Sequence, residues 1–380
     1  MRTSRRGTVD PFIVMDVMEA ARRAEAEGRT IIHMEVGQPG TPAPAAARRA
    51  LARAMEAGPM GYTVALGLPA LRQAIAGLYG TWYDVDLSPD RVVVTTGSSA
   101  AFQLAFLSLF DAGDKVAIGD PGYPSYRNIL KALSLTPVQI ATTSETRFQP
   151  SAADLDIPDL KGLLVASPAN PTGTMLDKPA LSRLMAAAEA RDISFISDEI
   201  YHGIHYGDRA VTALEVSDRA YVINSFSKYF SMTGWRIGWM VVPEAHVRRI
   251  ERLAQNLFIC PSHAAQVVGL AALSCGPELA ANVETYAANR ALLLEALPCA
   301  GFDRLAPPDG AFYIYADVSE WGEDSRALAA RILDEAGVAV TPGVDFDPTR
   351  GPGTLRFSYA GTTADMAEGA RRLIAWRDRQ

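Results

Sequence analysis

The feature that most constrains the fold is a regular alternation of short apolar runs and helical patterns between residues 91 and 242. Seven runs are rich in β-branched and other apolar residues: RVVVTT, KVAIGD, TPVQIAT, GLLVAS, ISFISD, AYVINS and WRIGWMVV. Helical patterns such as SSAAFQLAFLSLF and KPALSRLMAAAEA separate several of them. Apolar runs of strand length that alternate with helices are typical of sheets covered on both faces. The sequence therefore predicts an α/β domain with a mostly parallel, seven-stranded sheet covered by helices.

The segments that flank this block have other patterns. Residues 11 to 27 predict an amphipathic helix, and the alanine-rich stretch from 44 to 80 predicts two helices separated by a loop that holds Tyr62. From about residue 280, a long helix, strands such as GAFYIYADV and GTLRFSYA, a helix near 324 to 336 and a final helix predict a smaller α+β unit.

The length of 380 residues also favours two structural units, because single cores stop growing at roughly 250 to 300 residues. We expect a large α/β domain at residues 41–280 and a small C-terminal α+β domain at 281–380. The N-terminal segment, residues 1–40, is expected to pack with the small domain.

Composition excludes several classes of function. The net charge of -7 and the dispersed basic residues do not provide the basic patch of a nucleic-acid binder. Cys260, Cys275 and Cys299 form no close pair and no metal spacing, which indicates a reducing compartment. No stretch reaches the ~18 apolar residues of a membrane span. We therefore expect a cytoplasmic protein that binds neither nucleic acid nor membrane.

Ligands of open α/β sheets bind beyond the carboxyl ends of the strands, so the residues that follow each apolar run are the candidates for a site. RVVVTT is followed by Gly97, Ser98, Ser99 and Ala100, which open a helical pattern. Such a turn offers backbone N–H groups, hydroxyls and the positive end of a helix dipole to a phosphate. Serines here are also favoured as ordinary N-caps.

Two further runs end in proline-rich turns. After KVAIGD comes PGYPSY, in which Tyr123 can present its ring to a flat ligand or simply pack. After GLLVAS comes PANPTG, in which Asn170 lies between two prolines that fix its amide and favour a cis peptide. An ordinary Asx turn would have the same sequence signature.

Two later runs lead into ionisable residues. Asp198 follows ISFIS, and a carboxylate there is costly to bury unless it meets a cation. Glu199, His202 and His205 follow closely, but their separations do not match a zinc motif, so no metal is expected. AYVIN is followed by Ser225, Phe226, Ser227 and Lys228, and a single lysine is usually a solvated surface charge.

Taken together, the strand ends supply a phosphate cradle, an aromatic ring, an amide, an acid, a phenol and an amine. Pyridoxal 5'-phosphate (PLP) uses all of them, through its phosphate, ring nitrogen, phenolic oxygen and aldehyde. A nicotinamide or flavin site would need a GxGxxG turn, and the sequence has none.

The ordered motifs EVGQPG, GYTVALGLPALR, TGSSAAF, PGYPSY, SPANPTG, SDEIY, SFSKYFSMTGWRIG, PDGAFYIYAD and LRFSYA resemble those of the class I/II aminotransferases. These are PLP-dependent, fold type I, aspartate aminotransferase-like enzymes, and the resemblance runs from about residue 30 to 360. It implies that Lys228 forms the Schiff base with PLP and moves the proton between the substrate α-carbon and the cofactor. It also implies that Asp198 keeps the pyridine nitrogen protonated.

The same resemblance implies further roles around the cofactor. Asn170 and Tyr201 would hold the ring oxygen, with Tyr201 counted among the catalytic residues, and Tyr123 would stack on the ring. The residues that would bind the phosphate are Ser98, Ser99, Ala100, Ser225 and Arg236, with Tyr62 reaching in from the neighbouring subunit. If so, the active unit is a homodimer.

The substrate α-carboxylate would be held by Arg356, assisted by the Gly37 backbone and Asn170, although an arginine on such a strand is more often solvated. Some members of the family that take aspartate carry a lysine where this chain has Ser99. The resemblance therefore does not imply a preference for acidic substrates.

The function expected from these residues is transfer of the amino group of an L-amino acid to a 2-oxo acid, by a ping-pong mechanism through Schiff-base intermediates. A carbon–sulfur β-lyase, a decarboxylase or a γ-synthase would keep the same residues and stays open as an alternative. A non-enzymatic PLP-binding effector domain would need an additional N-terminal helix-turn-helix, for which a resemblance that begins near residue 30 leaves no room.

Overall fold

The seven apolar runs of the sequence form one sheet in the computed structural model, which describes residues 1–380. Its strands are β2 (Val92–Thr95), β3 (Lys115–Asp120), β4 (Thr136–Ala141), β5 (Leu160–Ala166), β6 (Ser194–Asp198), β7 (Tyr221–Ser225) and β8 (Gly238–Val241). They lie in the order β2-β8-β7-β6-β5-β3-β4, and β8 alone runs antiparallel to its neighbours. The predicted mostly parallel, seven-stranded sheet is confirmed.

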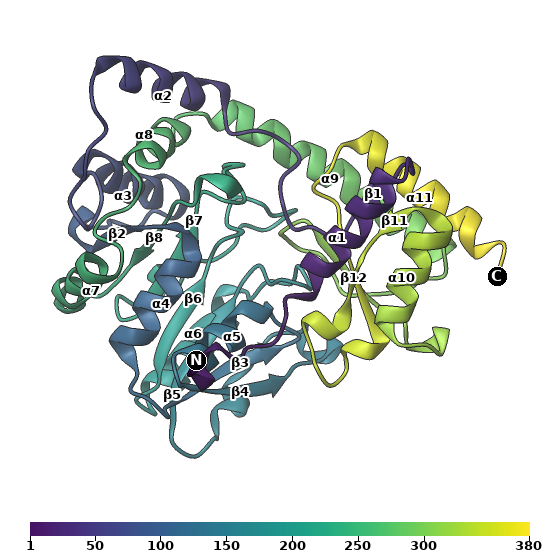
Figure 1. The fold of residues 1–380 in the computed structure, drawn as a ribbon. Helices are drawn as coiled ribbons and strands as arrows, with labels where there is room; N and C mark the ends of the chain where they lie inside the picture. The colour runs from purple at the N-terminus through teal and green to yellow at the C-terminus, as the bar shows by residue number, and fades with distance from the viewer.

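Helices cover both faces of this sheet (Figure 1). Val92 and Val94 of β2 contribute to one core, whereas Val93 between them contributes to the other, as the two-residue period of a strand requires. The covering helices are α3 (Pro69–Tyr83), α4 (Gly97–Leu109), α5 (Pro124–Ala132), α6 (Lys178–Glu189), α7 (Glu244–Leu257) and α8 (His263–Ala272). A further helix, α2 (Ala45–Ala57), packs on α8.

Local sequence explains where several helices begin and end. The Asp177 carboxylate accepts the Ala180 N–H at 2.7 Å and starts α6, with a proline at the helix start. Between α2 and α3 lies the predicted loop that holds Tyr62. Short 3-10 helices connect other elements: η1 (Arg5–Gly7), η2 (Pro89–Arg91), η3 (Ser144–Thr146), η4 (Ala152–Leu155), η5 (Ala213–Glu215), η6 (Thr233–Trp235), η7 (Ser319–Trp321), η8 (Gly343–Asp345) and η9 (Gly351–Gly353).

The C-terminal part of the chain forms a second, smaller layered unit. Its antiparallel sheet has the order β12-β13-β10-β9 and shares a core with helices α10 and α11 and the end of α9. The elements are β9 (Arg304–Leu305), β10 (Tyr313–Asp317), α10 (Ser325–Ala336), β11 (Val338–Ala339), β12 (Thr341–Pro342), β13 (Thr354–Ser358) and α11 (Thr363–Arg377). Phe312, Phe357 and Trp376 are fully buried in its core.

The N-terminal segment lies against this smaller unit. The strand β1 (Ile32–His33) pairs in parallel with β11, and the helix α1 (Ile13–Ala26) contacts β11 and β12. Figure 1 shows α1 crossing in front of the region between the two parts.

The long helix α9 (Gly276–Cys299) links the two parts (Figure 1). Leu279 near its start belongs to the core of the large sheet, whereas Leu293 and Leu297 belong to the core of the small unit. The division of the chain at residues 40 and 280 stays a prediction. No single helix is long and apolar enough to cross a membrane, although the bent pair α8 and α9 together has sufficient length and apolar composition.

Candidate active site

Strand direction brings the predicted site residues together at one edge of the large sheet. The strands β2, β3, β5, β6 and β7 all end at this edge, and β8, which runs the opposite way, begins there. One cavity lies at the edge. Its walls include ten of the residues expected from the sequence: Gly37, Ser98, Ser99, Tyr123, Asn170, Asp198, Tyr201, Lys228, Arg236 and Arg356.

Three of the expected residues do not line this cavity. Ala100 is buried in the first turn of α4. Ser225 lies behind Ser227, which does line the cavity, and the two hydroxyl oxygens are 2.8 Å apart. Tyr62 is 85% exposed and lies outside the wall of this cavity.

The α4 N-terminus and Arg236 form a positively polarised corner of the cavity. Thr96, the residue before α4, makes no side-chain cap, so the first N–H groups of the helix stay available. Gly97 has φ +74°, and a Cβ there would lie 2.5 Å from Arg236 Nη2, so glycine is needed for the guanidinium to reach this turn. N–H groups of a helix start beside an arginine match the geometry and charge of a phosphate dianion.

Asp198 ends β6 as a buried carboxylate without a cation in contact. Its Oδ2 accepts a hydrogen bond from the Tyr126 hydroxyl, and its Oδ1 accepts the Ile200 N–H at 3.0 Å. Burial raises the pKa of Asp198 to about 6, while these hydrogen bonds and the charge of Lys228 oppose the rise. A ring nitrogen that carries a proton would supply the cation that the chain itself does not.

Lys228 lies in the cavity with its amine held by a backbone carbonyl. Its Nζ donates to the Gly37 carbonyl oxygen at 2.6 Å. Burial lowers the pKa of Lys228 to about 8, and the nearby cations Arg356 and Arg236 add to this effect, while Asp198 opposes it. A larger neutral fraction near pH 8 makes the amine a better nucleophile and base.

Arg356 of β13 reaches the cavity from the small unit. It is 3% exposed, and its guanidinium lies over the Tyr313 ring, 4.3 Å from the centroid. Its Nη1 donates to the Asn170 Oδ1 at 2.8 Å, but its Nε has no partner and no carboxylate pairs with it. A buried guanidinium with only neutral partners is suited to bind a carboxylate from outside the chain.

Two tyrosines with important contacts were missed by the sequence interpretation. Tyr126 lies in the first turn of α5, three residues after Tyr123, and its hydroxyl donates a hydrogen bond to Asp198. The hydroxyl oxygens of Tyr313 and Tyr201 lie 2.7 Å apart. A Cβ on Gly37 would collide with the Tyr313 hydroxyl. The Tyr123–Tyr126 spacing of one helical turn was a usable signal, whereas nothing local in PDGAFYIYAD singled out Tyr313.

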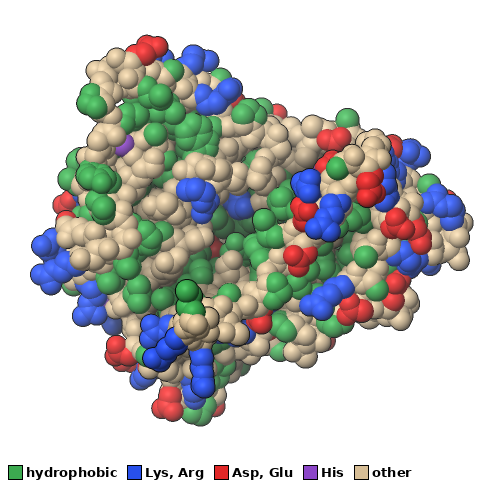
Figure 2. All heavy atoms as spheres, viewed as in Figure 1, with side chains coloured by type: hydrophobic (Ala, Val, Ile, Leu, Met, Phe, Trp, Pro, Cys, Tyr) green, Lys and Arg blue, Asp and Glu red, His purple; other side chains and the backbone are tan.

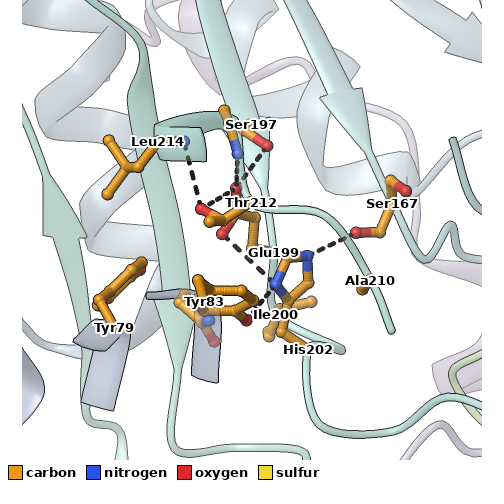
Figure 3. A network of polar contacts seen from close by, with 12 residues as sticks. Tyr79, Tyr83, Ser167, Ser197, Glu199, Ile200, His202, Ala210, Thr212 and Leu214 are labelled. Atoms are coloured by element: carbon orange, nitrogen blue, oxygen red, sulfur yellow. Dashed lines mark hydrogen bonds and ion pairs between the residues drawn. The ribbon is translucent and has the colours of Figure 1, made fainter. Parts of the chain in front are cut away.

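A buried polar network supports the turn that follows Asp198 (Figure 3). His202 Nδ1 lies 2.6 Å from the Tyr83 hydroxyl, and its Nε2 lies 2.9 Å from the Ser167 carbonyl oxygen. Glu199 Oε1 accepts hydrogen bonds from the Ser197 and Thr212 hydroxyls. Burial raises the pKa of Glu199 to about 8 and lowers the pKa of His202 to about 3. These residues tie together the ends of β5 and β6, which carry Asn170 and Asp198.

Most of the rest of the cavity wall is apolar. Phe12 and three residues of α1, Val14, Met15 and Met18, line it together with Val36, Phe102 and Ile200. Figure 2 shows a hollow between the two parts of the molecule with hydrophobic side chains gathered beside it. Most of the charged and hydrogen-bonding groups of the cavity come from the strand ends, whereas α1 contributes apolar side chains to its wall.

The fold and this cavity define the class: a PLP-dependent enzyme with the aspartate aminotransferase fold. The chain belongs to the aminotransferase class I and II family, whose family model matches residues 29–373. Valine–pyruvate aminotransferase of Mycobacterium tuberculosis is 46% identical, over 99% of this chain and 98% of that relative.

Solved structures agree with this assignment. A crystal structure of a Silicibacter pomeroyi protein described as an aminotransferase is 65% identical, with a TM-score of 0.96 and full coverage of both chains. The structure of aspartate aminotransferase from Thermus thermophilus with maleate is 30% identical and has a TM-score of 0.91, covering 99% of this chain and all of that one. The expectations of a transaminase and of PLP as its cofactor are thereby confirmed.

Proposed function

We propose that the enzyme transfers the amino group of an apolar L-amino acid, with valine as the first candidate, to pyruvate by a ping-pong mechanism. The observation that carries this proposal is the composition of the cavity wall. Its only cationic side chains are Lys228, Arg236 and Arg356, and each has a role at the cofactor or at the α-carboxylate. None is left to pair with an acidic side chain, whereas α1 offers apolar surface. The name of the Mycobacterium tuberculosis relative supports the same choice of substrates.

The residues of the cavity fit PLP, which supplies an aldehyde for the amino group and a ring that accepts electrons from the substrate α-carbon. In our proposal Lys228 binds the cofactor and then moves a proton at that α-carbon. Asp198 holds the proton of the ring nitrogen, Asn170 and Tyr201 bind the ring oxygen, and Tyr123 faces the ring. The residues proposed to bind the phosphate are Ser98, Ser99, Ala100, Ser225 and Arg236, with Tyr62 of a second subunit.

Arg356 is proposed to bind the α-carboxylate of both the amino acid and the oxo acid, with Asn170 and the Gly37 backbone beside it. Because Arg356 belongs to the small unit and Asn170 to the large sheet, binding would also hold the two parts together over the substrate. Closure of this kind excludes water while the α-carbon is deprotonated.

We also propose a homodimer in the cytoplasm. Five large hydrophobic side chains are exposed in the region of α2, the following loop and the end of α7: Met55, Tyr62, Val64, Leu257 and Ile259. Figure 2 shows hydrophobic side chains gathered over the α2 and α8 region. An apolar patch of this kind marks an interface more often than a free surface. Light scattering should give twice the mass of one chain, and Tyr62→Ala should weaken cofactor binding.

The transfer itself is tested by assays with panels of amino acids and oxo acids. We expect fast transfer from valine to pyruvate and slow transfer from aspartate. Release of ammonia and pyruvate from cystathionine without transfer to any oxo acid would contradict an aminotransferase and favour the β-lyase. Lys228→Ala should lose both activity and the absorbance near ~420 nm of the lysine-bound cofactor, whereas Lys161→Ala, at an exposed position, should keep them.

A further inference from the structure

The first turn of α1 is held by a carboxylate from a distant part of the chain. Phe12, the residue before the helix, makes no side-chain cap. Asp345 of η8 takes that role: its Oδ1 accepts the Ile13 N–H at 3.1 Å, and its Oδ2 accepts the Val14 N–H at 3.2 Å. A carboxylate at a helix start satisfies free N–H groups and interacts favourably with the helix dipole. One buried side chain therefore supplies the cap that the local sequence lacks.

Asp345 is itself fixed in place. It is fully buried, and its backbone carbonyl oxygen accepts a hydrogen bond from Arg127 Nη2 at 2.9 Å. Arg127 belongs to α5, the helix that also carries Tyr126 and follows Tyr123. Asp345 therefore links α1 to α5, the helix whose Tyr126 donates a hydrogen bond to Asp198. A shift of Asp345 would move α1 relative to the reactive end of the cavity.

The residues that Asp345 holds are those next to the apolar wall. Val14, Met15 and Met18 line the cavity on the first turns of α1, and the Phe12 ring packs edge-on against Tyr123 with centroids 5.8 Å apart. Asp16, on the same turns, is exposed and lies on the opposite side of the helix, against a groove formed with α10. We call the hydrogen bonds from the Ile13 and Val14 N–H groups to the Asp345 carboxylate the clamp. This clamp fixes one face of α1 against the cavity.

We propose that Asp345 is a positioning residue that holds α1 over the cavity and thereby sets the enzyme's selectivity among apolar amino-acid side chains. The proposal rests on the proposed function, because it concerns the side-chain end of the same site. Asp345 does not line the cavity, so its effect on the side-chain end passes through Val14, Met15 and Met18, whereas its charge near Arg356 would affect large and small substrates alike. A larger side chain that fills the space below α1 depends on the clamp more than a small one does.

The test is Asp345→Asn in the cofactor-loaded enzyme, because the amide keeps the shape but loses the charge and one of the two acceptors. Loss of a capping side chain changes a local equilibrium by about a factor of five. We expect kcat/KM for valine to fall about five- to tenfold, mainly through KM, and kcat/KM for alanine to change less than about twofold. Amide hydrogen exchange of residues 13–18 should become faster, while the cofactor absorbance stays the same.

The matched control is Asp16→Asn, which removes the same charge from the first turn of the same helix without touching the clamp. It should leave the valine-to-alanine ratio of kcat/KM unchanged. If Asp345→Asn does not fold, Ile13→Pro provides a second variant. Proline is favoured at the first helical position, and there it removes one of the two clamped N–H groups.

Faster exchange in α1 with an unchanged valine-to-alanine ratio would overturn the proposal, and so would unchanged exchange. Failure of the proposed function has a different signature. In that case the wild-type enzyme itself would not accept valine, and the exchange rates, together with the ratio between the larger and smaller of its actual substrates, would still test Asp345.

Discussion

The Arg356 guanidinium and the Asn170 side-chain amide oxygen lie 2.8 Å apart, although 186 residues separate them in the sequence. Arg356 belongs to β13 of the small unit, and Asn170 lies in the turn after β5 of the large sheet. Their contact joins the two parts of the molecule across the cavity. The cation has no carboxylate partner, which supports its proposed role in binding an anionic group of the substrate.

Arg356→Gln should weaken the binding of both substrates, because each carries an α-carboxylate. Removal of one partner of a buried charge pair costs several kcal/mol, so kcat/KM for valine and for pyruvate should fall about 10²- to 10³-fold. Steady-state kinetics with both substrates measure this effect. The cofactor absorbance should not change, and Arg371→Gln, in an exposed ion pair on α11, should behave as wild type. A loss confined to one of the two substrates would contradict the assignment.

Tyr126→Phe should shift the pH dependence of activity. The Tyr126 hydroxyl donates to Asp198 and opposes the rise of its pKa, so its removal raises that pKa further. In the proposed mechanism, activity needs the ionised carboxylate and is lost as pH falls through this pKa. The acid limb of kcat should therefore move to higher pH by about one unit, with about a twofold loss at pH 7 and recovery at higher pH. Tyr221→Phe, which removes a hydroxyl from the opposite end of the sheet, should keep the wild-type profile. An acid limb that stays in place would refute the role of Tyr126.

His33→Gln should destabilise the protein at acidic and neutral pH but not in alkali. His33 Nδ1 lies 2.8 Å from Oε1 of the buried Glu35, and this interaction raises the pKa of His33 to about 9 from the ordinary 6.5. A raised pKa contributes stability that is complete below pH 6.5 and is lost as pH rises through about 9. Because the imidazole is partly exposed, we expect a difference of about 1 kcal/mol in the free energy of unfolding at pH 6. Urea unfolding at pH 6 and pH 10 tests this, and an equal difference at both would count against it.

His202→Leu should destabilise the fold through the network of Figure 3. The substitution leaves the Tyr83 hydroxyl and the Ser167 carbonyl without partners in a buried region, at a cost of about 2–4 kcal/mol. Tyr83→Phe alone should cost about 1 kcal/mol. The double variant should be less destabilised than the sum, since both changes remove the same hydrogen bond. Denaturant unfolding of the three variants gives the coupling, and strict additivity would show that the two side chains do not interact.

The sequence was informative about the fold because each strand and helix carries its own periodicity. RVVVTT and SSAAFQLAFLSLF differ in length and in pattern, and the structure places β2 and α4 there. The same local reading located most of the cavity, since Asp198 ends a strand and Asn170 and Lys228 lie in the turns that follow strands. Parallel strands end at one edge of a sheet, so residues that follow different strands in the sequence lie close together in the structure.

Contacts between distant elements could not be read in the same way. The sequence of α1 predicts an amphipathic helix, but nothing near residue 13 indicates that Asp345, 332 residues away, caps it. Ser225 illustrates a finer limit: its place at the end of β7 was expected, yet packing puts Ser227 at the cavity and Ser225 behind it. Which of two neighbouring side chains faces a site depends on backbone geometry that periodicity does not specify.

The sequence by itself determined the α/β architecture, the family and the set of strand ends that form the site. Only the tertiary structure decided that Tyr126 holds Asp198, that Tyr313 meets Tyr201, and that Asp345 sets the position of α1. The physical reason is that hydrophobic periodicity specifies which face of an element is buried. The partner that each polar group finds is settled only when those faces pack and every buried donor and acceptor must be satisfied.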